Sequence, residues 1–140
     1  MADSKHRAVW DWLLGCPYIQ DLFFNFAQSD DGDAALVPSE AVLQEFIDGS
    51  SLSSYDVTIT RAQTCSFEPN DPENIAQLER LDLLRDWLET QGAAGSFPEF
   101  PVGEYVQELY LLPGEDGFAD GVDGGCRYLL RLRIEYLKEA

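Results

Sequence analysis

Residues 71 to 91 carry a helical pattern that is long enough to constrain how the rest of the chain packs. Asp71 is a good N-cap, Pro72 suits the first turn, and Glu73 complements the positive end of the helix dipole. Apolar residues then recur every three or four positions, at Ile75, Leu78, Leu81, Leu84 and Leu88, with Trp87 beside them. The pattern predicts a helix that ends at Gly92 and buries this face against another layer.

Alternating residues predict that this other layer is a sheet. In residues 127–136, large apolar side chains occupy every second position and charged residues fill most of the others. Residues 55–60 alternate in the same way, and residues 42–48, which end at Gly49, are placed to form a hairpin with them. Residues 22–28 and 104–112 are further strand candidates. The chain therefore predicts several strands with one buried face.

The remaining segments complete the expected fold. Asp3 or Ser4 can cap a short first helix, which Gly15 and Pro17 stop. Residues 92–103 and 113–125 are rich in turn-forming residues and predict loops. The order helix, strands, long helix, strands predicts a single α+β domain over residues 1–140. We expect a mostly antiparallel sheet, covered on one face by a short N-terminal helix and one long central helix.

The charge balance excludes several classes of function. The chain has 9 Lys and Arg against 26 Asp and Glu, a formal charge of −17. Such a surface repels polyanions, so sequence-specific or nonspecific nucleic-acid binding is not expected. No apolar run approaches the length that spans a bilayer, and none resembles a signal peptide. We therefore expect that the protein is cytosolic where it is made and does not associate with a membrane. The three cysteines lack metal or disulfide spacing and predict reduced thiols.

A search for catalytic chemistry finds no specific pattern. The only histidine, His6, lies near the N-terminus and is expected to be exposed. Nucleophile-elbow, phosphate-loop and dinucleotide-loop sequences are missing from the chain. The acidic loops lack calcium-loop spacing, because alignment on Gly121 places Phe118 and Arg127 at ligand positions. The aromatic residues at 23, 24 and 26 lack basic neighbours, which favours core packing over base stacking. We therefore predict that the protein is not an enzyme and that it binds no cofactor and no metal ion.

Three arginines on one face of the last predicted strand offer a different role. Arg127, Arg131 and Arg133 either pair with carboxylates of their own chain or contact an acidic patch of a neighbouring copy. The second alternative joins two different patches, a head-to-tail contact that closes into a ring when the rotation permits. The sequence leaves both alternatives open.

Five segments, in order along nearly the whole chain, resemble one protein family. They are VWDWLLGCP (9–17), EFIDGS (45–50), LRDWLE (84–89), FPEFP (97–101) and CRYLLRLRIEY (126–136). The chain resembles the minor capsid or tail-terminator (tail-completion) proteins of siphophages and prophages of Gram-positive bacteria. It departs from them in its acidity and in the long Gly/Asp loop before the last strand.

The resemblance implies a structural, non-enzymatic protein that forms a hexameric ring. The ring caps the tail tube, stops its polymerisation and presents a surface to head-completion proteins. It would assemble in the bacterial host cytoplasm and remain in the virion neck. We expect the arginines at subunit contacts and two acidic loops at the lumen or a partner-facing rim: Asp30, Asp31, Asp33, Asp116, Asp120 and Asp123. Alternatives are another neck component, such as a head–tail joining protein, and a soluble acidic binding module.

Overall fold

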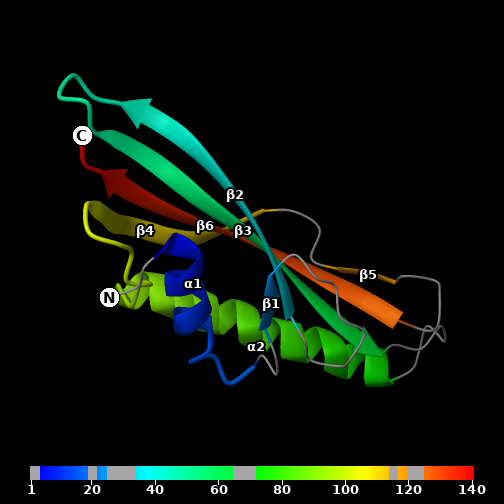
Figure 1. Cartoon of the computed structure of the whole chain (residues 1–140). Coiled ribbons are helices and arrows are strands. Elements are labelled where there is room, and N and C mark those ends of the chain that lie inside the picture. Colours follow the sequence, from blue (N-terminus) through cyan, green and yellow to red (C-terminus); the bar gives the residue numbers. More distant parts are fainter. Residues whose placement is uncertain (1–3, 19–21, 25–33, 65–71, 114–116, 120–124) are drawn as a thin grey trace.

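The computed structural model describes residues 4–18, 22–24, 34–64, 72–113, 117–119 and 125–140. Its elements are α1 (Lys5–Leu13), β1 (Leu22–Phe24), β2 (Ala34–Glu45), β3 (Ser51–Thr64), α2 (Pro72–Ala94), β4 (Glu104–Leu112), β5 (Gly117–Ala119) and β6 (Gly125–Lys138). Both helices lie on the same side of one sheet (Figure 1). The predicted α+β fold, with two helices over one face of a mostly antiparallel sheet, is confirmed.

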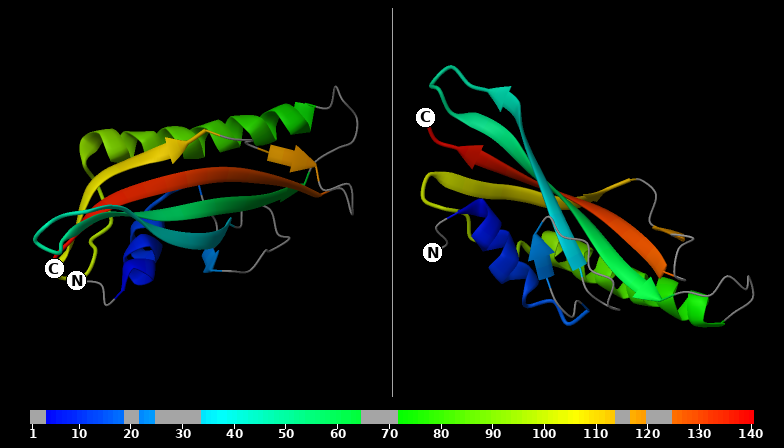
Figure 2. Two further views of the ribbon diagram at one scale, coloured as in Figure 1. Left: turned by 90° about the horizontal axis from the view of Figure 1, so that it is seen from above. Right: turned by 45° about the vertical axis from the view of Figure 1, so that its right-hand side comes forward.

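Four long strands form the body of the sheet, in the order β2-β3-β6-β4, with β1 beyond β2. All pairs among these four are antiparallel, and only the short β1–β2 pair is parallel. β3 and β6 pair over their full length, from Ser51 opposite Lys138 to Thr64 opposite Gly125. The strands twist strongly along this length (Figure 2), as long antiparallel ribbons do. One end of the sheet holds the β2–β3 turn and the end of β6 (Figure 1).

The first helix begins where the sequence predicts. The Ser4 side chain accepts a hydrogen bond from the Arg7 backbone N–H at 3.1 Å, which satisfies one of the free N–H groups of the first turn. Val9 and Leu13, four residues apart, are completely buried. Ser4 is therefore the cap, one of the two residues that the sequence offers for this role, and one face of α1 is buried.

The long helix differs from its prediction in two respects. It continues through Gly92 to Ala94, and Gly95, in a left-handed conformation with φ of 72°, follows its last residue. Ile75 and Leu78 were expected in the buried stripe but are 58% and 50% exposed. Among the described side chains of α2 burial begins at Leu81, because periodicity identifies the face that a helix turns to the core and not how much of that face is covered.

Three strand predictions also need correction. The hairpin is confirmed, but its first strand begins at Ala34, and residues 46–48 lie in the turn and not in the strand. Pro38 obscured the strand in the sequence, although proline is tolerated there because this part of β2 is at the sheet edge. The predicted loop 113–125 contains β5, which pairs with β6. Of the predicted strand 22–28, residues 22–24 form β1 and the others lie outside the described residues.

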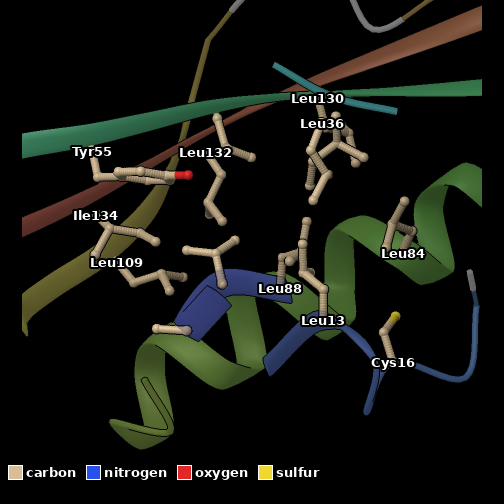
Figure 3. Packing of buried hydrophobic residues seen from close by; sticks show 14 of the residues in the cluster. Leu13, Cys16, Leu36, Tyr55, Leu84, Leu88, Leu109, Leu130, Leu132 and Ile134 are labelled. Atoms are coloured by element: carbon tan, nitrogen blue, oxygen red, sulfur yellow. The ribbon is translucent and has the colours of Figure 1, made fainter. Parts of the chain in front are cut away.

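The core lies between the helices and the inner face of the sheet (Figure 3). Alternate residues of β3 and β6 point into it, as the sequence predicts, and Leu84 and Leu88 of α2 meet them from the other side. Leu13 and Cys16 close the core beside α1, and Cys16 is a buried free thiol. The buried cluster is Ala8, Val9, Leu13, Cys16, Leu36, Tyr55, Val57, Ile59, Leu81, Leu84, Leu88, Phe100, Leu109, Leu130, Leu132, Ile134 and Tyr136.

Candidate functional site

The face of the sheet opposite the helices is covered by no described element, and we call it the outer face. Its position follows from alternation, because residues of β6 next to the buried ones must point away from the helices. The outer face carries Val37 of β2, Tyr105 and Tyr110 of β4, and Arg131 and Arg133 of β6. Val37 and Tyr105 are each 49% exposed, although both lie within strands that pair with a neighbour.

Arg133 makes an ion pair within its own chain. The strand register places it directly opposite Asp56 of β3. Its Nε and one terminal nitrogen donate to the two carboxylate oxygens of Asp56, each at 2.9 Å. These hydrogen bonds raise the pKa of Arg133, so it remains a cation across the whole useful pH range. The sequence left two roles open for the arginines, pairing with a carboxylate of the same chain or contact with a neighbouring copy. In the single chain, Arg133 has the first of these roles.

Arg131 is in a different situation, although it lies only two residues away on the same face. It is exposed, and the residues next to it in the register are Thr58 of β3 and Leu112 of β4. Its side chain makes no hydrogen bond or ion pair with any residue that the structure describes. Arg127 lies further along β6, opposite Ala62 and Phe118, but its side chain is outside the described part. The predicted intersubunit role of both residues stays a prediction.

The turn between β2 and β3, with the last residues of β2, forms a second exposed surface. Large apolar side chains gather there: Val42 is 59% exposed, Leu43 41%, Phe46 39% and Ile47 fully exposed. Two acidic residues, Glu45 and Asp48, lie among them. We call this surface the hairpin patch: Val42, Leu43, Glu45, Phe46, Ile47 and Asp48. Sequence reasoning missed it because it assigned residues 46–48 to a strand, although Phe46 and Ile47 directly before an Asp-Gly turn were a usable signal.

The turn that carries the hairpin patch is held by its own hydrogen bonds. The Phe46 N–H donates to the Ser50 carbonyl at 2.9 Å, and Gly49 adopts a φ of 91° that other residues rarely accept. One carboxylate oxygen of Asp48 accepts from both the hydroxyl and the backbone N–H of Ser50. These bonds lower the pKa of Asp48, which is therefore ionised at neutral pH. Ile47 thus projects from an ordered turn.

A polar network joins α1 to the sheet on the helix side. Lys5 Nζ lies 2.9 Å from Glu40 and 3.3 Å from Glu104, and it lies over the ring of Tyr136. Burial alone would lower the pKa of Lys5, but the hydrogen bond to Glu40 and the Tyr136 and Glu104 interactions outweigh it and raise the pKa to about 12. The network is a structural contact that fixes the start of α1 on the sheet.

His6 is exposed, as the sequence predicts, and it also belongs to this contact. Its Nδ1 lies 2.7 Å from the hydroxyl of Tyr55, a residue that is completely buried. Burial, and then the charge of Glu40, raises the pKa of Tyr55, so the phenol stays protonated. The Tyr55 hydroxyl donates to His6 when Nδ1 carries no proton.

In the part of the chain that the structure describes, no group of three or more His, Cys, Asp or Glu residues could hold a metal ion. No helix among the described residues is long and apolar enough to cross a membrane. The predicted rim or lumen residues all lie outside the described ranges: Asp30, Asp31, Asp33, Asp116, Asp120 and Asp123.

Comparison with known proteins assigns no family to the chain. No protein-family model matches it, and no curated protein matches it significantly.

Proposed function

We propose that the protein is a structural subunit of a siphophage-type tail. Copies join into a hexameric ring that caps the tail tube, ends its polymerisation and offers a joining surface to head-completion proteins. Its action depends on shape and association and involves no bond-making. The ring assembles in the bacterial host cytoplasm and stays in the neck of the virion.

The outer face of the sheet, which no described element covers, carries this proposal. When an antiparallel sheet in a stable monomer leaves one face in contact with water, that face is usually polar. Here the face exposes Val37, Tyr105 and Tyr110 around charged residues. Aromatic, aliphatic and arginine side chains together are the composition of protein–protein interfaces. A self-associating subunit accounts for this surface, and the sequence resemblance supplies the kind of assembly.

Electrostatics sets a condition on such a ring. Six copies at −17 each would carry a formal charge of −102. Repulsion of this size weakens association at low ionic strength, when screening lengths exceed the spacing of surface charges. The ring is therefore expected to tighten as salt rises from about 0.01 M to about 0.15 M. Carboxylates that face a central channel would also repel DNA and let it pass without binding.

The function is tested with the tail-tube protein of the same phage. The tube protein is polymerised in vitro with and without the purified chain, and tube lengths are measured by negative-stain electron microscopy. We expect shorter tubes in its presence, with a ring of density at one end. An unchanged length distribution, with no density at tube ends, would contradict the proposal.

Particles that lack the protein separate this role from the neck alternative. Overlong tubes in such particles agree with termination. Tails of normal length that are detached from heads would instead identify a head–tail joining protein. The measurement is the length distribution of tails from a host that carries a deletion of the gene.

A further inference from the structure

We propose that the hairpin patch of one copy docks on the outer face of the next copy, around Arg131. This inference rests on the proposed ring and names the two surfaces that form its repeating contact. The occupant of the outer face is a second copy of this chain, and the contact is head-to-tail, because two different patches meet.

The hairpin patch has the properties of an inserting element. Ile47 is fully exposed at the tip of an ordered turn, a position where glycine, asparagine, aspartate or serine is usual. The internal hydrogen bonds of the turn mean that little conformational entropy is lost when it binds. Phe46 and Val42 enlarge the apolar surface on either side. The turn therefore presents a rigid apolar tip between two carboxylates.

The outer face offers what this tip requires. Arg131 is exposed and has no ion-pair partner among the described residues, whereas neighbouring Arg133 is neutralised by Asp56. The strand register surrounds Arg131 with Leu112 and Thr58, and Tyr110 lies one step along the same face of β4. Arginine and tyrosine side chains close together are typical of an interface hot spot.

Charge complementarity selects a copy of the same chain as the partner. The hairpin patch contains two acidic residues, Glu45 and Asp48, and no basic residue. Lys138 of β6 lies outside the patch, opposite Ser51 of β3. Its partner must therefore be apolar and basic. In a chain with 26 acidic and 9 basic residues, an exposed arginine among apolar side chains is a scarce feature, and the outer face supplies one.

The turn cannot reach this site within its own molecule. Lys138 of β6 lies beside the turn, and Arg131 is seven residues further along the same strand. At the rise of a strand, these seven residues span about 23 Å. The turn is fixed at one end of the sheet, so contact requires a second molecule. Contacts between two different patches repeat around a ring or along a filament, and this agrees with an annular assembly.

Two variants and their mixture test the contact. Ile47→Asp removes the hairpin surface and Arg131→Glu removes the receiving surface. We expect each variant alone to weaken self-association at least tenfold, as measured by sedimentation velocity. An equimolar mixture should form one-to-one dimers in native mass spectrometry, because the intact hairpin of the Arg131→Glu chain can still dock on the intact face of the Ile47→Asp chain. The other two patches are both damaged, so these dimers cannot grow into rings.

Arg7→Glu is the matched control. Arg7 is also exposed, its side chain also makes no ion pair with described residues, and its reversal changes the net charge by the same amount. It should change self-association less than threefold, whereas an equal effect of both reversals would mean that global charge alone matters and would overturn the inference. Circular dichroism of all variants checks folding, and because Ile47, Arg131 and Arg7 are exposed, each variant should fold.

The outcomes separate this inference from the proposed function. If the wild-type chain forms rings and both variants also form them, the contact is wrong while the ring stands. If each variant is monomeric and the mixture also stays monomeric, the head-to-tail pairing of these two patches is wrong. A wild-type chain that never associates would overturn the proposed ring and this contact together.

Discussion

Replacement of Gly92 by alanine tests how closely α2 packs on β4. A Cβ at residue 92 would lie 2.4 Å from the carbonyl oxygen of Leu109, where ordinary contact begins at 3.4 Å. Because the obstructing atom belongs to the backbone of a paired strand, helix and strand must separate by about 1 Å. Forced overpacking of this kind costs about 1–3 kcal/mol. A backbone oxygen cannot move aside as a side chain can, so we expect a cost in the upper part of this range, about 2–3 kcal/mol. Alanine returns up to about 1 kcal/mol through its helix propensity, which leaves a net loss of about 1–2 kcal/mol.

The loss is measured by urea unfolding followed through tryptophan fluorescence. Trp12 and Trp87, whose ring centroids are 5.3 Å apart, report on the contact between the two helices. Submicromolar protein keeps association from adding to the measured stability. Ala93→Gly, at an exposed neighbouring position, is the control, and it should lose about 1 kcal/mol or less from propensity alone. A Gly92→Ala variant that is as stable as the wild type, or more stable, would refute the close approach.

Three further substitutions test contacts inside the chain. Lys5→Met should cost about 1 kcal/mol at neutral pH, after allowance for solvent screening. Because the pKa of Lys5 rises from 10.5 to about 12 on folding, this contribution is complete below pH 10.5 and is lost as the pH rises through 12. Urea titrations measure the difference in unfolding free energy between Lys5→Met and the wild type, and a difference that stays constant over that pH range would contradict this account. Tyr55→Phe removes the hydrogen bond to His6 and should lower the unfolding free energy by about 1 kcal/mol, and an unchanged urea midpoint would argue against that bond. Ser54 is completely buried and its hydroxyl has no hydrogen-bond partner among the described residues, so Ser54→Ala should leave stability unchanged or raise it by up to about 1 kcal/mol, and a clear loss in thermal unfolding would disprove this.

The periodic parts of the fold could be predicted from the sequence because their patterns match their burial. Residues 104–112 were expected as a strand and form β4 with the same bounds. Tyr55, Val57 and Ile59, chosen by alternation alone, are all buried. The part of β2 around Pro38 was missed because it lies at the sheet edge beyond β1, where one neighbour is lacking and proline and exposed side chains are tolerated.

The candidate surfaces were harder to predict because they depend on register. Arg131 and Arg133 look equivalent in the sequence, since both occupy the charged side of one alternating strand. Only the pairing of β3 with β6 shows that Asp56 faces Arg133 and that Thr58 faces Arg131. The exposure of Ile47 likewise depends on where β2 ends, which is set by the hydrogen bonds of the turn. Local periodicity contains neither piece of information.

The mass of the purified 140-residue chain in solution tests the central claim most directly. Native mass spectrometry and sedimentation velocity should detect a closed species of six copies, about 94 kDa from a chain of 15.7 kDa, whose population grows with concentration without giving larger forms. Monomer at every concentration and salt level, or a continuous series of ever larger polymers, would contradict a subunit that works by closing into a ring.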